Sequence, residues 1–204
     1  MGVVSRPFSC YKSNMISITE QREPNLPTRA ARYLTAEVCH AAGVSRDLLR
    51  AWTQPNRNIV ALSWAERPVI RRGVAHLFSW NRLMQVAVIE ALGRAGCWLP
   101  SIGAKAAVLF SDVGSDGADI PGCLGPDVPS RRPAACFDAG RTILSVRFGN
   151  DNSAEPITEV HQIDDSEPFG AVWGRLTDGA DGVTILDCAA IVDRVKARLA
   201  IDTE

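Results

Sequence analysis

The sequence predicts an α+β protein, in which a helical N-terminal part is joined by an acidic linker to a small C-terminal antiparallel sheet covered by one helix. Three observations lead to this prediction. Apolar residues recur at helical spacing through much of residues 33–110, glycine, proline and aspartate dominate residues 111–133, and short β-leaning runs separated by turn residues fill most of residues 134–204. Residues 1–32 lack the apolar core of a secretory signal and are expected to be disordered, with Met15 as an alternative start.

The first expected helix begins near residue 34 and ends at a glycine turn. Thr35 is its expected N-cap, and Gly43 can adopt the left-handed conformation in which helices commonly end. Its apolar residues share one helical face: Val38, Ala41 and Ala42. This spacing predicts a short helix packed against its neighbours.

A second helix, residues 46–53, follows with Ser45 as the expected N-cap. Its buried face is expected to hold Leu48, Leu49 and Trp52. The residues that then face solvent or a ligand are Arg46, Asp47, Arg50 and Ala51. Two helices joined by a glycine turn are the helix-turn-helix arrangement that places the second helix in the DNA major groove, although many helical hairpins of this kind bind nothing.

Residues 54–78 favour a β-hairpin over a helix. Two β-leaning runs, Ile59 to Leu62 and Val74 to Phe78, are separated by a segment that contains Pro68 and Gly73. Arginines gather in this region, and guanidinium groups bind phosphate oxygens in pairs of hydrogen bonds: Arg57, Arg67, Arg71 and Arg72. We therefore expect a wing that grips the DNA backbone, with a solvated basic loop as the alternative. A helix capped by Ser79 is expected at residues 80–95, and a shorter one at residues 101–110.

Several residues of the N-terminal part follow one another in the order that a known protein family shows. They are Glu37-Val38, Gly43-Val44-Ser45, Leu49-Arg50 and Trp52, then Phe78-Ser79, and finally Pro100 to Ile102. In this order, residues 33–106 resemble the DNA-binding domain of the MerR family of winged-helix transcription regulators, which usually have tyrosine where Trp52 stands. The resemblance implies that recognition-helix residues approach DNA, namely Ser45, Arg46, Arg50 and Trp52, while the wing follows the backbone.

Two departures limit what the resemblance implies. His76 stands where the family usually has a wing arginine, so that phosphate contact there requires a protonated His76 or a neighbour such as Arg72. The long helix through which MerR dimers pair is absent, because residues 111–133 are rich in glycine and proline. The family's mechanism of untwisting a promoter therefore does not follow.

Charge is distributed unevenly along the chain. Residues 29–110 carry 11 Lys and Arg against 4 Asp and Glu, a net charge of +7, whereas residues 111–204 carry 8 against 17, a net charge of −9. This asymmetry indicates an acidic segment attached to one that binds nucleic acid.

A chain of 204 residues, 46% of them hydrophobic, can bury a core, and two small domains fit it better than one. We expect a DNA-binding domain at residues 33–110, a flexible linker at 111–133 and a small α+β domain at 134–204. In this last domain strands are expected at Ala134 to Phe137, Thr142 to Phe148, Ile157 to Ile163 and Val183 to Leu186, before a helix capped by Asp187. Dimerisation is its favoured role, with ligand or partner binding left open.

Enzymatic and metal-binding motifs are missing from the sequence. No phosphate-binding glycine loop, GxSxG or HExxH occurs, so no catalytic residue and no cofactor are assigned. A polar turn has the residues of a possible cation site, but such side chains are usually solvated: His161, Asp164, Asp165 and Glu167. The six cysteines form no close pair, which favours structural roles and a reducing cytoplasm: Cys10, Cys39, Cys97, Cys123, Cys136 and Cys188.

The sequence thus predicts a cytoplasmic transcription regulator that binds double-stranded DNA as a homodimer, without a membrane span, a metal or an enzymatic activity. The alternative is a protein-interaction or recombination accessory protein that uses the same winged-helix fold.

Overall fold

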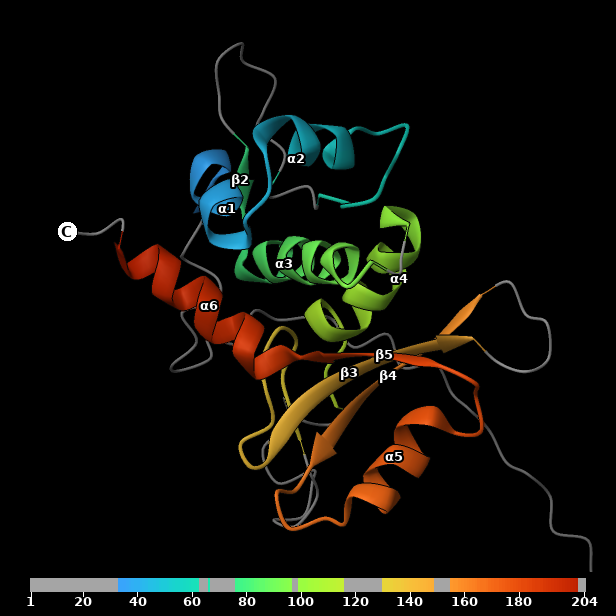
Figure 1. The fold of residues 1–204 in the computed structure, drawn as a ribbon. Coiled ribbons are helices and arrows are strands. Elements are labelled where there is room, and N and C mark those ends of the chain that lie inside the picture. Colours follow the sequence, from blue (N-terminus) through green and yellow to red (C-terminus); the bar gives the residue numbers. More distant parts are fainter. Residues whose placement is uncertain are drawn as a thin grey trace, which may run out of the picture.

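The computed structural model describes residues 33–62, 66, 76–96, 99–115, 130–148 and 155–201. These residues form six helices, one antiparallel sheet of two strands and another of three, which confirms the α+β class. In Figure 1 the first four helices lie above the three-stranded sheet, α6 runs along one side from the sheet toward α1, and α5 lies below the sheet. Among the described helices, none is long and apolar enough to cross a membrane.

The helical part begins with β1 (Tyr33–Leu34), α1 (Thr35–Ala42) and α2 (Arg46–Thr53). The N-cap of α1 is Leu34, not Thr35 as predicted, and the Leu34 backbone N–H donates to the Glu37 carboxylate over 2.5 Å. Gly43 ends α1 in the left-handed region, with φ of 80°, and its N–H donates to the Cys39 carbonyl. The glycine turn predicted from the sequence is therefore confirmed.

A short strand, β2 (Leu77–Phe78), precedes α3 (Trp80–Arg94) and α4 (Pro100–Ser111). β2 pairs with β1, Tyr33 opposite Phe78, and not with residues 59–62 as the predicted hairpin required. Residues 59–62 form no strand, because Val60 N–H bonds to the Trp52 carbonyl and ties this segment back to α2. Of the predicted wing, residues 63–65 and 67–75 lie outside the described residues.

The C-terminal part contains β3 (Arg141–Phe148), β4 (Pro156–Ile163), α5 (Phe169–Thr177), β5 (Val183–Asp187) and α6 (Cys188–Ile201). The strand order is β4-β3-β5, with β3 antiparallel to both neighbours. The predicted sheet and the helix packed on it are therefore present. The first predicted strand, residues 134–137, is not a strand: Phe137 N–H donates instead to the Thr142 hydroxyl over 2.8 Å. Helix α5 was not predicted.

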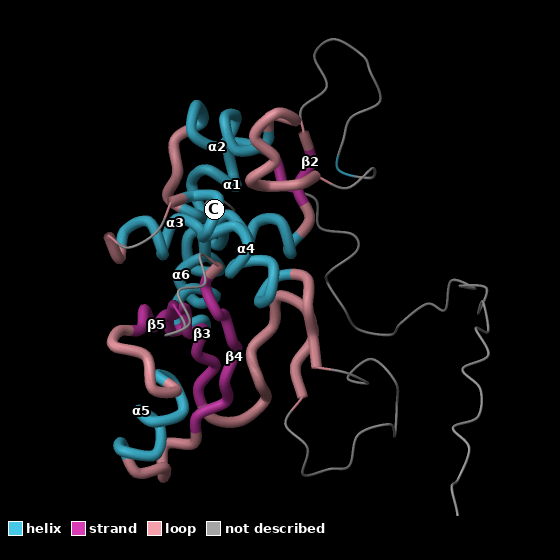
Figure 2. Tube along the Cα trace, turned by 90° about the vertical axis from the view of Figure 1, so that its right-hand side faces the viewer, coloured by secondary structure: helices cyan, strands magenta, loops and turns pink. Residues whose placement is uncertain are grey.

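One hydrophobic core joins the helical part to the sheet. Buried Leu144 of β3 and Val195 of α6 belong to the same cluster as Val38 of α1 and Leu83 of α3. The Trp80 indole N–H also donates to the Ala134 carbonyl over 3.1 Å. Figure 2 shows the sheet directly below the helices, with α6 between them. The structure differs here from the prediction of two domains that need not touch, because α6 packs on α1 and α3 as well as on β3.

Both described ends of the predicted linker are packed. The Arg131 guanidinium donates to the carbonyls of Leu109, over 2.7 Å, and Phe110, over 3.1 Å. Arg131 N–H bonds to the Ser115 hydroxyl, and Ser115 N–H bonds to the Arg131 carbonyl. Residues 111–115 and 130–133 therefore form part of the folded body, while residues 116–129 lie outside the described residues.

Candidate nucleic-acid interface

Helix α2 is held by its buried side and presents its other side to solvent. The Ser45 hydroxyl accepts a hydrogen bond from Leu48 N–H over 3.2 Å, which confirms Ser45 as the N-cap. Leu49 and Trp52 are buried in the core. Eight helical residues span about 12 Å, a length that fits the major groove of B-DNA. The N-terminal end of α2, where the helix dipole is positive, is open to solvent.

Three arginines lie on or beside this exposed side. Arg46 and Arg50 are on α2, and Arg57 is in the turn after it. All three side chains are exposed, and none forms an ion pair or side-chain hydrogen bond with another residue of the described ranges. Their guanidinium groups can therefore bind phosphate oxygens or guanine edges without first breaking an ion pair or a hydrogen bond to a described residue.

Two residues of α2 differ from the sequence-based expectation. Leu48 was placed on the buried face, but it is 41% exposed, because Leu49 and Trp52 form the buried face of α2 and Leu48 lies at its edge. Trp52 was placed in contact with DNA by the family resemblance, yet only 4% of it is exposed. The Trp52 indole lies in the core, as the helical spacing predicted. It can therefore hold α2 in position, but it cannot contact DNA.

Of the remaining predicted phosphate contacts, His76 alone lies within the described residues. His76 is exposed and directly precedes β2, which the pairing with β1 holds beside the N-terminus of α1. Arg67, Arg71 and Arg72 lie outside the described residues. The structure therefore brings Ser45, Arg46 and Arg50 together on one helix, and places Arg57 next along the chain.

A buried carboxylate that sequence reasoning missed lies within the predicted wing, residues 54–78. Glu66 is buried, and it accepts hydrogen bonds from both the N–H, at 3.0 Å, and the hydroxyl of Ser79. Arg82 Nε lies 3.6 Å from the same carboxylate, and Arg82 Nη1 donates to Asp112 over 2.8 Å. The sequence held one signal for this role: Glu66 is the single acidic residue between Arg57 and Arg72. This network anchors residue 66 to the first turn of α3.

Helix α6 reaches the turn between α1 and α2. Arg198 Nη1 donates to the Ala41 carbonyl over 3.2 Å and lies beside Gly43. A cation near the last carbonyls of α1 also compensates the negative end of that helix dipole. The C-terminal helix thereby contacts the segment that sets the angle between α1 and α2.

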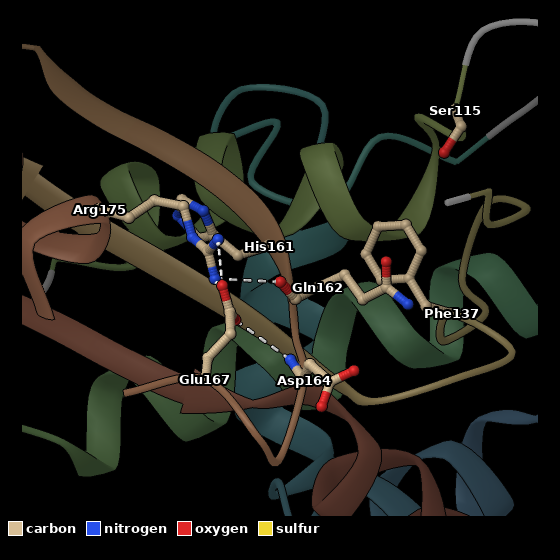
Figure 3. Close-up of a pocket in the computed structure, with 7 residues that line it drawn as sticks. All are labelled: Ser115, Phe137, His161, Gln162, Asp164, Glu167 and Arg175. Atoms are coloured by element: carbon tan, nitrogen blue, oxygen red, sulfur yellow. Dashed lines mark hydrogen bonds and ion pairs between the residues drawn. The ribbon is translucent and has the colours of Figure 1, made fainter. Parts of the chain in front are cut away.

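A shallow hollow of about 470 Å³ lies at the edge of the three-stranded sheet, away from α2. In Figure 3 the Arg175, His161 and Glu167 side chains lie together at one end, with Gln162 and Phe137 toward the other. Arg175 makes a bidentate ion pair with Glu167, with distances of 2.9 and 2.8 Å, which lowers the pKa of that carboxyl. His161 Nε2 lies 2.8 Å from the Ser145 hydroxyl.

The chemistry of the hollow favours a structural role. Burial is the main cause that lowers the pKa of His161, and Ser145 is buried, so this Ser–His pair does not present a nucleophile to solvent. Asp164 accepts hydrogen bonds from Ser166, which lower the pKa of Asp164, and Asp165 pairs with Arg141. Within the described ranges, no group of three potential metal ligands converges.

The described cysteines lie in or beside the core. Cys39 and Cys188 are buried, Cys136 is partly buried, and all three are free thiols. Burial raises the pKa of the Cys188 thiol to about 12, so this thiol is unreactive at neutral pH. The other three cysteines lie outside the described residues.

Comparison with known proteins adds no assignment. No protein-family model matches this chain, and no curated protein matches it.

Proposed function

We propose that the protein is a transcription regulator that binds double-stranded DNA sequence-specifically as a homodimer. The observation that carries the proposal is the exposed side of α2, where Arg46 and Arg50 stand without an ion pair to a described residue, while Leu49 and Trp52 fix the opposite side in the core. The short glycine turn before α2 and the similarity of residues 33–106 to MerR regulators support the same function.

In this proposal the N-terminal end of α2 enters the major groove. Ser45 and Arg46 lie nearest the bases, and Arg50 lies one turn further along the helix. Arg57 and His76 bind phosphates, together with the arginines at positions 67, 71 and 72. Trp52 acts by positioning the helix. If about six cations meet phosphates, the slope of log affinity against log salt is about −5.

Fluorescence anisotropy with the DNA upstream of the protein's own gene, over a salt series, tests the proposal. We expect Arg46→Ala and Arg50→Ala each to weaken binding by roughly 5- to 150-fold, the effect of about 1–3 kcal/mol. Lys196→Ala is the matched control, because it removes one exposed cation from α6 and should leave affinity nearly unchanged.

Two results contradict the proposal. One is the absence of salt-dependent binding to any duplex at moderate salt. The other is equal affinity of the Arg46→Ala, Arg50→Ala and Lys196→Ala variants, since α2 would then contribute nothing specific.

A further inference from the structure

Strand β4 lies at an edge of the three-stranded sheet, where it pairs with β3 alone. Alternate residues of an edge strand direct their N–H and C=O groups away from the sheet, where another strand can bind them. Within the part of the chain that the structure describes, the backbone of residues 158–160 forms no hydrogen bond outside its ladder with β3. These residues of β4 therefore have an unpaired edge.

Two hollows follow this edge. The hollow of about 470 Å³ is lined by His161 and Gln162 of β4, and a second hollow, of about 660 Å³, is lined by residues 158–161 of the same strand. The two hollows also share Arg175. They therefore form one groove along residues 158–162, which we call the β4 groove.

The β4 groove has protein surface on both faces of the sheet. In Figure 1, α4 lies above the sheet and α5 lies below it, so Leu109 of α4 and Arg175 of α5 line the groove from opposite faces. Figure 3 shows Phe137 beyond Gln162, at the end away from Arg175. The side chains of an added strand would point alternately to the two faces. Both sets of side chains would then meet surface to pack on, as in sheet edges that bind extended peptides.

The charge of the β4 groove is mainly negative. Among the described side chains that line it, four are acidic and two are basic: Glu159, Asp164, Glu167 and Asp178 against Arg147 and Arg175. Both arginines are already paired with carboxylates, and only 3% of the Arg147 side chain is exposed. A partner in the groove therefore meets carboxylates more than cations.

Two of these carboxylates converge on Arg147 and remain open to solvent. The Arg147 guanidinium donates to Glu159 Oε2 over 2.6 Å and to Asp178 Oδ2 over 3.0 Å. The side chains of Glu159 and Asp178 are 45% and 74% exposed. The second oxygen of each carboxylate forms no hydrogen bond with a described residue. The three side chains carry a net charge of −1, and these two oxygens can accept hydrogen bonds from a lysine or arginine of a partner.

We propose that the β4 groove binds an extended basic segment of a partner protein, which adds to the sheet as a fourth strand beside β4. Backbone hydrogen bonds to β4 supply affinity, and basic side chains that reach Glu159 and Asp178 supply specificity. The negative charge repels DNA phosphates, and it disfavours a second copy of this chain, because two acidic grooves would then meet.

This surface goes beyond the proposed function and does not depend on it. In both Figure 1 and Figure 2, β4 and α5 lie at the end of the molecule opposite α2. A partner in the β4 groove therefore leaves the candidate DNA-binding helix uncovered, and its binding is measurable without DNA.

Fluorescence anisotropy of the full chain without DNA tests the proposal. The probe is a fluorescein-labelled peptide of the eight-residue length of β4, in which lysine and valine alternate. We expect a Kd between about 10 and 500 µM. Replacing its lysines with glutamates should weaken binding at least about tenfold, because the groove is acidic. Methylating its central backbone nitrogens should also weaken binding at least about tenfold, because it removes the donors that a strand offers to β4.

Substitutions of the chain test the charges separately. Asp178→Asn and Glu159→Gln each remove one negative charge and keep an oxygen that accepts from Arg147. Each should weaken binding of the lysine peptide by about 2- to 5-fold, the effect of an exposed ion pair. Asp193→Asn is the matched control, because it removes an exposed carboxylate of α6 outside the groove and should leave affinity unchanged.

Amide hydrogen exchange measured by NMR locates the bound peptide. Saturating lysine peptide should slow the exchange of the outward-facing amides among residues 158–162 at least about tenfold. Unchanged exchange there overturns the inference, and so does equal binding of the lysine, glutamate and methylated peptides. The absence of binding at about 1 mM peptide also overturns it. Protection of these amides that rises with protein concentration without peptide assigns the edge to a second copy and overturns the basic partner.

Discussion

Replacing Gly43 with alanine perturbs the turn between α1 and α2 in two separable ways. Gly43 has a φ of 80°, in the region that disfavours any residue with a Cβ. That Cβ would also lie 2.9 Å from Arg198 Nη1, the cation that α6 places beside the turn. The substitution therefore tests both the turn and its contact with α6.

The two contributions have different sizes. Left-handed backbone costs a residue with a Cβ about 1–2 kcal/mol. Arg198 can swing away from the new methyl group, but it then loses its hydrogen bond to the Ala41 carbonyl, a loss of about 0.5–1.5 kcal/mol. Gly43→Ala should thus destabilise the protein by about 1.5–3.5 kcal/mol in total. Gly96→Ala should cost only the first part, because Gly96 has a φ of 76° and a Cβ there meets nothing within 4 Å.

Urea denaturation of four variants measures this difference: Gly43→Ala, Gly96→Ala, Arg198→Ala, and Arg198→Ala combined with Gly43→Ala. In the Arg198→Ala background the cost of Gly43→Ala should fall to that of Gly96→Ala. Equal costs of the two glycine substitutions in the wild-type background would refute the contact between α6 and the turn. A neutral Gly43→Ala would refute the left-handed turn itself.

Two further predictions concern the sheet and the shared core. Burial, supported by Arg175 and Arg147 and opposed by Glu159, lowers the pKa of His161 below its usual 6.5. The stability that this group contributes is therefore present above pH 6.5 and is lost as the pH falls through the lower folded-state value. His161→Gln should flatten this part of the urea-midpoint profile, and profiles that stay parallel as the pH falls below 6.5 would contradict it. Removing residues 116–204 deletes α6, whose four buried side chains (Cys188, Ile191, Val192 and Val195) contribute roughly 6–12 kcal/mol, comparable to a whole domain's stability. Residues 1–115 alone should then lack a cooperative thermal transition by circular dichroism, and a sharp transition would argue for an independent N-terminal domain.

Local signals predicted the helices well. The expected helix at 80–95 is found at Trp80–Arg94, and that at 101–110 is found at Pro100–Ser111. Ser79 and Ser45 both cap helices as predicted. Caps, glycine turns and apolar periodicity act within a few residues, so they can be recognised without knowing the rest of the fold.

Pairing between distant segments could not be read in the same way. β2 is only two residues long and finds its partner in β1, some 40 residues earlier, so the nearer run at residues 59–62 looked like the better strand. Helix α5 was missed because Pro168 precedes it and two glycines interrupt it, and these residues argue for a loop. Both elements depend on tertiary contacts that no short window contains.

The candidate interface was predicted in part. The exposure of Arg46 and Arg50 followed from the helical face, whereas Arg57, expected in a wing hairpin, lies exposed in the turn after α2. For Trp52, helical spacing predicted burial while the family resemblance placed it at DNA, and its exposed fraction of 4% supports the spacing. Glu66 was overlooked because its partners, Ser79 and Arg82, lie 13 and 16 residues away. Its role is visible only once β2 and α3 are in place.

The distribution of charge divides this chain in two, whereas the hydrophobic core does not. The change from +7 in residues 29–110 to −9 in residues 111–204 suggested two domains, yet Val38, Leu83, Leu144 and Val195 lie in one core. Charged side chains lie at the surface, so their distribution bears on steering and on which side meets a polyanion, not on where a core ends. Arg198 illustrates the point, because this cation of the acidic segment lies at the turn before α2. The acidic segment therefore supports the candidate DNA-binding helix directly, and its own negative charge disfavours any approach of DNA from the side of α5.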